Sequence, residues 1–126
     1  MFEAHCDYSI KVDGNMMLCT MQGAWNVEGT VEYFESVKQH AQTLIQSPWG
    51  RIVDTTHFDA GPIEIMQILI DIQKWSLEHN CQLLVIVGSK TLNRDIIEKN
   101  KHQYPKMALA STMEEAIKQI KQCLEE

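Results

Sequence analysis

The stretch QLLVIV, from Gln82 to Val87, decides the fold. Every residue after the first is apolar, and such short runs are typical of strands buried on both faces in the middle of a parallel sheet. Before it, the residues from Ile63 to Leu77 are apolar on most faces of a predicted helix. This helix opens at Gly61-Pro62, because proline at an early helical position loses no hydrogen bond. The apolar run from Arg51 to Thr55 predicts a further strand ahead of that helix.

An N-terminal hairpin is predicted from two short strands and a turn. Residues Tyr8 to Val12 alternate in polarity, Asp13-Gly14-Asn15 is a strong turn signal, and Met16 to Met21 form the returning strand. Asn26 or Thr30 can cap the helix that follows. The expected strands cover residues 8–12, 16–21, 51–55, 82–87 and 104–110, and the expected helices end near residues 45, 77, 100 and 124.

The start of the last helix carries two overlapping capping boxes, Ser111 with Glu114 and Thr112 with Glu115. A short helix over residues 93–100 precedes the last strand. Strands and helices that alternate after a hairpin predict an α/β fold with a mixed, mostly parallel sheet and about four helices. The chain shows no repeat or linker, so residues 1–126 are expected to form a single domain.

Composition narrows the function classes. The chain is 44% apolar and 22% charged, with 17 acidic against 11 basic residues and a net charge of −6. This acidic balance argues against nucleic acid and against anionic membranes as partners, since both require a cationic face. No apolar run reaches the roughly 20 residues that span a bilayer, and the N-terminus has no signal-peptide pattern. We therefore expect a cytoplasmic protein without integral membrane association.

The four cysteines form no metal or disulfide motif. Cys6, Cys19, Cys81 and Cys123 are scattered without a CxxC pair. Free, mostly buried thiols in a reducing compartment are the expected state. Neither a metal nor a cofactor is predicted.

Polar residues gather where the third strand gives way to the second helix. Ligands of open α/β sheets lie beyond the carboxyl ends of parallel strands, and Gly88 and Ser89 end the neighbouring strand. We therefore predict a composite binding edge there, with Trp25 from the turn after the second strand. The predicted binding residues are Asp54, Thr55, Thr56, His57, Phe58, Asp59 and Gly61, together with Trp25 and Ser89.

The same residues raise chemical alternatives. Asp54, His57 and Asp59 could do acid–base work or share a cation if they converged, but the simpler interpretation is that both acids bond backbone amides in a tight turn. A triad with Ser89 lacks a nucleophile elbow, and Gly88-Ser89-Lys90 lacks the longer glycine-rich run of a phosphate loop. Catalysis is not expected.

One further cluster and one tryptophan have a structural interpretation. Glu78, His79 and Cys81 resemble a metal cluster, but His79 near a helix end complements the helix dipole. Trp25 follows a strand exit, where an exposed indole would favour a partner or an apolar ligand. Burial in the core is the default for a tryptophan.

This layout resembles the STAS or SpoIIAA-like domains over essentially the whole chain. The resemblance rests on Gly23 followed by a capped helix, on the stretch from Arg51 to Gly61, and on residues Ala110 to Ile117 at the start of the last helix. The similarity is greatest to a bacterial branch described as SpoIIAA-like or STAS/Sec14-like.

In the antagonist members of that family, a serine in an Asp-Ser-Ser-Gly-like motif is phosphorylated by a partner kinase. The corresponding stretch runs from His57 to Pro62, where Asp59 matches the acid and Gly61 the glycine. Ala60 or Gly61 stands at the serine position, and Thr55 and Thr56 lie upstream. The phospho-switch is therefore not expected in this chain.

The resemblance implies a non-enzymatic protein-interaction or regulatory module that binds another protein or a second copy of itself. The alternative is the binding or sensing of a small apolar or lipid-like molecule, which predicts an enclosed pocket near Trp25, Met66 and the second helix. A small enzyme built on Asp54, His57 and Asp59 is the weakest of the three hypotheses.

Overall fold

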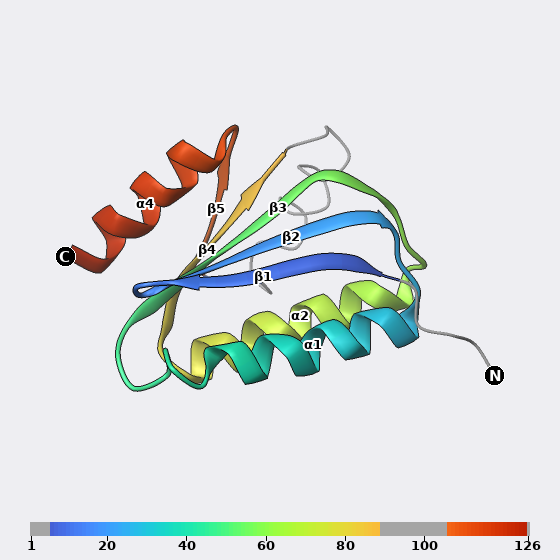
Figure 1. The fold of residues 1–126 in the computed structure, drawn as a ribbon, viewed down its shortest axis with the longest axis horizontal. Coiled ribbons are helices and arrows are strands. Elements are labelled where there is room, and N and C mark those ends of the chain that lie inside the picture. The colour runs from blue at the N-terminus through green and yellow to red at the C-terminus, as the bar shows by residue number, and fades with distance from the viewer. Residues whose placement is uncertain (1–5, 89–105, 126) are drawn as a thin grey trace.

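The sheet has the mixed, mostly parallel topology that the sequence predicts. A computed structural model describes residues 6–88 and 106–125, which form five strands that lie side by side in chain order (Figure 1). These are β1 (Asp7–Asp13), β2 (Met16–Ala24), β3 (Trp49–Ala60), β4 (Cys81–Val87) and β5 (Met107–Ala110). β1 and β2 pair antiparallel as a hairpin, and every other neighbouring pair is parallel.

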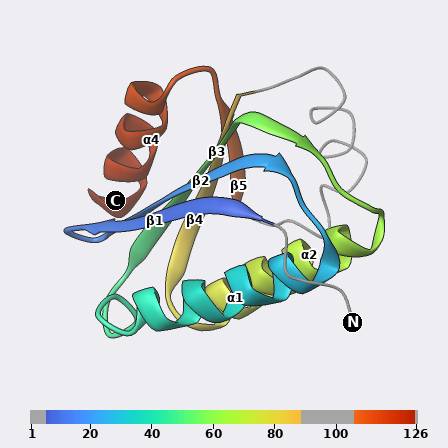
Figure 2. The same cartoon turned by 45° about the vertical axis from the view of Figure 1, so that its right-hand side comes forward.

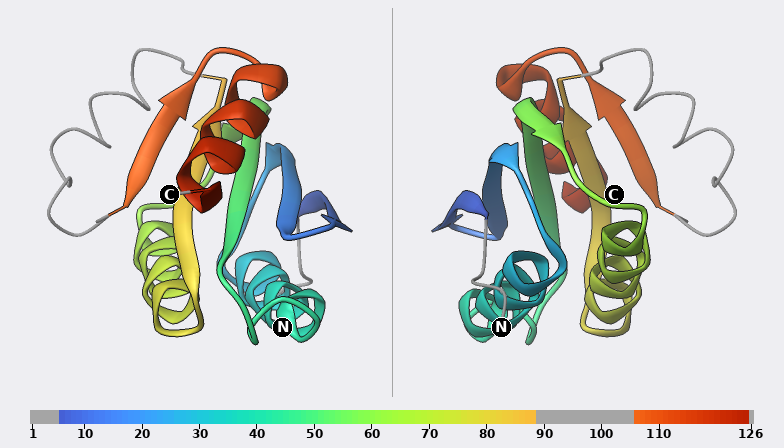
Figure 3. Two further views of the ribbon diagram at one scale, coloured as in Figure 1. Left: turned by 90° about the vertical axis from the view of Figure 1, so that its left-hand side faces the viewer. Right: turned by 90° about the vertical axis from the view of Figure 1, so that its right-hand side faces the viewer.

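Helices cover both faces of the sheet. α1 (Val27–Ala41) and α2 (Glu64–Glu78) lie together on one face, and α4 (Met113–Glu125) lies on the other (Figures 1 and 2). The end-on views separate the two layers most clearly (Figure 3). The helix expected over residues 93–100 and the predicted binding residue Ser89 lie outside the described residues.

Strand alternation divides the core into two layers. Within β3, Trp49 and Val53 belong to the layer beneath α1 and α2, whereas Ile52 belongs to the layer beneath α4. α4 approaches the sheet closely at Gly50. A Cβ atom added to this glycine would lie only 2.5 Å from side-chain atoms of Ile120. The packing of α4 on the sheet therefore requires a residue without a side chain at position 50.

Local signals set the ends of several elements as expected. The Asn26 side chain accepts a hydrogen bond from the Gly29 amide at 2.8 Å and caps α1. At the start of α4, the Glu115 amide donates to Thr112 Oγ1 at 3.1 Å, and the Glu115 carboxylate accepts from the Ser111 amide at 2.9 Å.

The end of α1 differs from the expectation. The helix is expected to end near residue 45, but it ends at Ala41, and residues 42–46 form a turn.

The main correction concerns β3, which runs from Trp49 to Ala60 instead of from 51 to 55. Its extra residues pair with the end of β2, with Gln22 opposite His57 and Gly23 opposite Phe58. Two register irregularities on this stretch give β3 more residues than β2. The predicted binding residues from Asp54 to Asp59 thus lie on a bulged strand and not in a turn after it.

The end of β4 is fixed by Gly88. This glycine has φ +90°, and a Cβ on it would lie 2.7 Å from both the amide nitrogen and Oγ1 of Thr56. Glycine is therefore required at position 88 for two reasons. The backbone is left-handed there, and it lies too close to β3 for any side chain.

Replacing Gly88 by alanine should lower the free energy of unfolding by about 3 kcal/mol, because left-handed strain adds to a clash with backbone. Gly14→Ala is the matched control. Gly14 also has a positive φ, +60°, but a Cβ on it would meet no atom within 4 Å. This control substitution should cost only about 1 kcal/mol. Urea denaturation measures both values, and equal losses would contradict the close approach at Gly88.

Candidate functional site

β3 separates from β4 at Thr55. The last paired residues are Asp54 on β3 and Val87 on β4. Thr55 is buried, and its hydroxyl donates to the Val87 carbonyl at 2.8 Å. Because this hydroxyl is buried and bonded to backbone, Thr55 has a structural role and its side chain is not available to a ligand.

Asp54 stabilises the first bulge of β3. Its Oδ1 accepts hydrogen bonds from the amide of Thr56 at 3.0 Å and from the Thr56 hydroxyl. The prediction that Asp54 bonds a backbone amide is therefore confirmed, although the amide belongs to a bulged strand. Thr56 itself is exposed.

The last residues of β3 alternate between the core and solvent. Phe58 packs edge-on against Trp25 with ring centroids 6.0 Å apart, whereas His57 and Asp59 are exposed. Over residues 6–88 and 106–125, no three His, Cys, Asp or Glu side chains lie close enough together to hold a metal ion. Asp54, His57 and Asp59 therefore do not converge.

Trp25 lies inside the molecule. It is 3% exposed, and its indole nitrogen donates to the Gln22 carbonyl at 3.0 Å. Its ring also contacts Tyr8 and Tyr33 edge-on, at centroid distances of 6.1 and 5.0 Å. The indole is therefore buried, as is the default for a tryptophan, and not exposed as the alternative required; its ring packs against Phe58.

The exposed surface lies at the junction of β3 and α2. Gly61, Pro62 and Ile63 are exposed there, and Ile63 reaches 82% exposure. Gly61 lies against the Trp25 carbonyl and the Ile65 side chain, where a Cβ would clash with Ile65. We call this surface the β3–α2 corner; it consists of Thr56, His57, Asp59, Gly61, Pro62 and Ile63.

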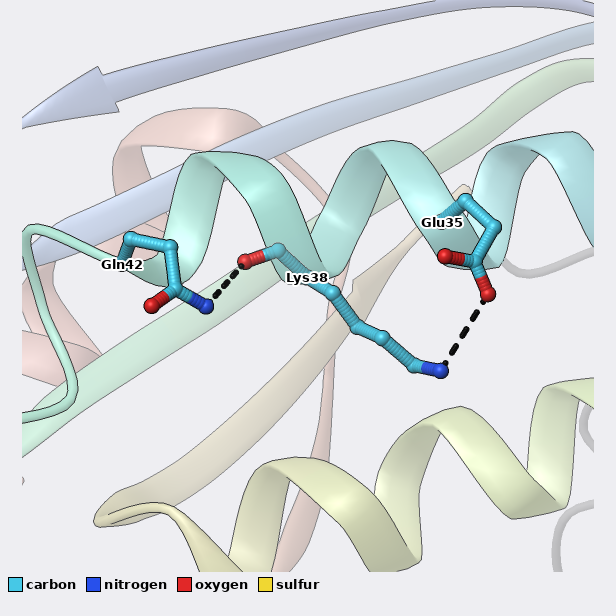
Figure 4. Close-up of polar contacts among 3 residues, drawn as sticks. All are labelled: Glu35, Lys38 and Gln42. Atoms are coloured by element: carbon cyan, nitrogen blue, oxygen red, sulfur yellow. Dashed lines mark hydrogen bonds and ion pairs between the residues drawn. The ribbon is translucent and has the colours of Figure 1, made fainter.

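The outer face of α1 differs from this corner. Lys38 forms an ion pair with Glu35 at 3.2 Å, and its carbonyl accepts a hydrogen bond from the Gln42 side chain (Figure 4). The Lys38 ammonium also lies 4.3 Å from the centre of the Phe34 ring. Such local contacts are typical of a solvated helix face and contribute little to stability.

Glu78, His79 and Cys81, the residues that resemble a metal cluster in the sequence, lie at the end of α2 and the start of β4. His79 caps the C-terminal end of α2, and its Nδ1 lies 2.7 Å from the Trp75 carbonyl. Cys81 is buried at the start of β4. The predicted position of His79 at the helix end is confirmed, and its effect on the helix dipole stays a prediction.

The sequence matches no protein-family model and no curated protein. Solved structures do match its fold. An uncharacterised protein of Shewanella loihica with a SpoIIAA-like fold aligns over 95% of this chain and 97% of its own, at 12% identity and a TM-score of 0.67. A proposed anti-sigma factor antagonist of Thermotoga maritima aligns over 90% and 94%, at 9% identity and a TM-score of 0.71. The anti-sigma factor antagonist SpoIIAA in its unphosphorylated form aligns over 91% and 98%, at 11% identity and a TM-score of 0.63.

The chain has a SpoIIAA-like fold. The expected resemblance is confirmed at this level. Identities of 9–12% show the fold alone. Among the described helices, none is long and apolar enough to cross a membrane.

A second group of functional interest was not predicted from the sequence. Arg51, Tyr33 and Gln73 are 3%, 0% and 0% exposed, and Cys19 and Cys81 are also buried. By strand alternation Arg51 points to the same side of β3 as Trp49 and Val53, beneath α1 and α2. We call Arg51 and the groups that its charge reaches the Arg51 cluster: Cys19, Tyr33, Arg51 and Cys81.

Burial dominates the electrostatics of this cluster. It raises the pKa of the Cys81 thiol to about 11, although the nearby Arg51 charge acts in the opposite direction. Burial likewise raises the pKa of Cys19 and of Tyr33, and Arg51 again opposes the shift. Reactive cysteines generally have a lowered pKa, and the pKa of these two thiols is raised.

The raised pKa of Cys81 predicts a loss of stability at alkaline pH. An unfolded thiol loses its proton near pH 8.5, whereas the folded thiol keeps it to about pH 11. The stabilising contribution is complete below pH 8.5 and is lost as the pH rises to about 11. In that window the free energy of unfolding should fall by up to about 1.4 kcal/mol per pH unit from this group.

Urea denaturation of wild type and Cys81→Ala between pH 8 and 11 measures this effect. The variant should show a flatter decline. Val85→Ala is the control, because it removes buried atoms from the same strand without removing a thiol. It should be less stable throughout and keep the wild-type slope. A Cys81→Ala slope as steep as that of wild type would contradict the prediction.

Proposed function

We propose that this chain is a non-enzymatic, cytoplasmic regulatory module that binds a protein partner through the β3–α2 corner. The observation that carries the proposal is Ile63, which is 82% exposed and follows the exposed polar residues His57 and Asp59 in the chain. An exposed large apolar side chain can serve as the central contact of a protein–protein interface, with polar residues at the rim. The single-domain organisation predicted from the sequence is part of this proposal.

The local geometry supports a preformed binding surface. The Asp54–Thr56 hydrogen bonds and the packing of Phe58 on Trp25 hold the strand end that presents the corner. A surface that is ordered before binding loses less conformational entropy on association. The fold neighbours include anti-sigma factor antagonists, which adds support for a protein partner.

The corner is proposed to work without the serine phospho-switch. Thr56 is the exposed hydroxyl of the corner, and it already donates to Asp54. Ala60 and Gly61 offer no hydroxyl. Partner binding would therefore be governed by the presence of the partner and not by phosphorylation at that position.

Binding of a small apolar molecule has weaker support. That alternative predicts a pocket near Trp25 and Met66, and the rings of Tyr8, Tyr33 and Phe58 pack around Trp25. Native mass spectrometry of gently purified protein tests the alternative, which requires a retained small molecule.

Ile63→Ser should abolish capture of the partner without loss of folding, because Ile63 is almost fully solvated in the free protein. Wild-type and variant proteins are immobilised, exposed to lysate of the source organism, and the retained proteins are quantified by mass spectrometry. Sedimentation velocity of the same proteins reports binding to a second copy. We expect at least a tenfold loss, as for a central contact residue.

Val31→Ser is the matched control. Val31 is the other exposed large apolar residue in the described part of the chain, at 48%, and it lies on α1 outside the corner. This variant should retain the partner. A protein captured equally by all three baits, or a monomeric wild type that captures nothing, would contradict the proposal.

A further inference from the structure

The Arg51 cluster combines burial with unpaired polar atoms. Within the described residues, Nε and Nη1 of Arg51, the hydroxyl of Tyr33 and both amide atoms of Gln73 are buried without a hydrogen-bond partner. The Cys19 thiol lies close to the Tyr33 hydroxyl, but a thiol is only a weak hydrogen-bonding group. Buried polar groups in native proteins are almost always paired, and each exception requires an explanation.

Other buried polar side chains of the same molecule are satisfied. The hydroxyls of Thr30, Thr55 and Ser76 donate to the carbonyls of Asn26, Val87 and Ile72 at 2.7–2.8 Å. The unpaired atoms therefore concentrate in three side chains, Tyr33, Arg51 and Gln73, together with the amide oxygen of Gln119 on α4. Arg51 and Tyr33 lie close enough for the arginine charge to affect the tyrosine hydroxyl.

The charge of Arg51 is also uncompensated. The buried polar or charged residues of the described chain are Thr30, Arg51, Thr55, Gln73 and Ser76, and none of them is an acid. The Arg51 side chain carries a positive charge. A buried charge without a partner costs several kcal/mol. A negative charge beside Arg51 would remove most of that cost.

The chemistry of the unpaired atoms indicates what kind of group would satisfy them. The unpaired atoms of Arg51 and Tyr33, which lie near each other, all carry N–H or O–H donors, and a donor-rich set selects an acceptor that carries negative charge. Cys19 and Cys81 remain protonated and supply no negative charge. Exposures of 0–3% exclude a bulky ligand from this layer.

We propose that Arg51 binds a small inorganic anion, of the size of chloride or nitrate, in the layer between the sheet and helices α1 and α2. Tyr33, whose hydroxyl lies within reach of the Arg51 charge, donates its hydroxyl hydrogen to the same site. The anion neutralises the only buried charge among the described residues. This inference is independent of the β3–α2 corner, so failure of either proposal leaves the other intact.

Crystals grown in sodium bromide test the site directly, because bromide is located by its anomalous scattering. We expect an anomalous peak within hydrogen-bonding distance of Arg51 Nε or Nη1. Only water at these atoms, or a carboxylate of the chain paired with the guanidinium, would overturn the proposal.

Thermal unfolding gives a solution test at constant ionic strength, with sodium bromide replacing sodium gluconate. An anion that binds only the folded state raises Tm by about 5 °C for each tenfold increase above its Kd. Arg51→Met should remove this response. Lys11→Met, which removes an exposed positive charge from β1, should retain it.

Tyr33→Phe keeps the experiment decisive if Arg51→Met does not fold. The loss of one donor should raise the bromide concentration needed for a given Tm increase by about fivefold, as expected for one hydrogen bond. A wild-type Tm that is equal in bromide and gluconate, or a response unchanged in Arg51→Met or in Tyr33→Phe, would contradict anion binding.

Discussion

The hydrogen bond from the Thr55 hydroxyl to the Val87 carbonyl closes the last contact between β3 and β4, and the course of the chain beyond it depends on this separation. At this point β4 ends, and Gly88 turns away with its Cα against Thr56. β3 continues beyond it and pairs with β2 alone among the described strands. The polar residues after Asp54 are therefore carried on an extended, bulged strand, and this strand end delivers the chain into α2 with Ile63 exposed.

The two faces of β3 serve different purposes. Towards α4 it presents Gly50 and Ile52, which allow a close, wholly apolar contact with Ile120. Towards α1 and α2 it presents Trp49, Arg51 and Val53, so that one charge lies within a buried layer that contains no acid among its buried residues. A buried charge costs stability in a core, and in some proteins it is retained because it gives structural specificity. The proposed anion would satisfy that charge, and the corner at the end of the same strand would meet the partner.

Much of the fold could be predicted from local sequence signals. Three predicted features appear in the structure: the strand from Gln82 to Val87, the turn at Gly14 and the helix cap at Asn26. Each depends mainly on residues that are close together in the sequence. β3 was predicted too short because Asp54, Thr55 and Thr56 read as turn residues. The alternation of His57, Phe58 and Asp59 was the signal for a strand, but the partner that stabilises it, the end of β2, is a tertiary contact.

The site was predictable in position and not in detail. The edge after the third strand follows from the general topology of α/β sheets, whereas the burial of Thr55 and Trp25 depends on contacts with Val87, Tyr33 and Phe58. Arg51 illustrates the same limit. An arginine at the start of a strand gives no sequence signal for burial, and only the arrangement of α1 and α2 over the sheet encloses it.

The most direct test of this account is amide hydrogen exchange over residues 49–63. Pairing with β2 predicts that residues 57–60 contain amides that exchange far more slowly than those of an unstructured peptide, as do residues 49–54. Slow exchange that stops at Asp54, with residues 57–60 exchanging at the unstructured rate, would show that the polar stretch is a loop and would contradict the account.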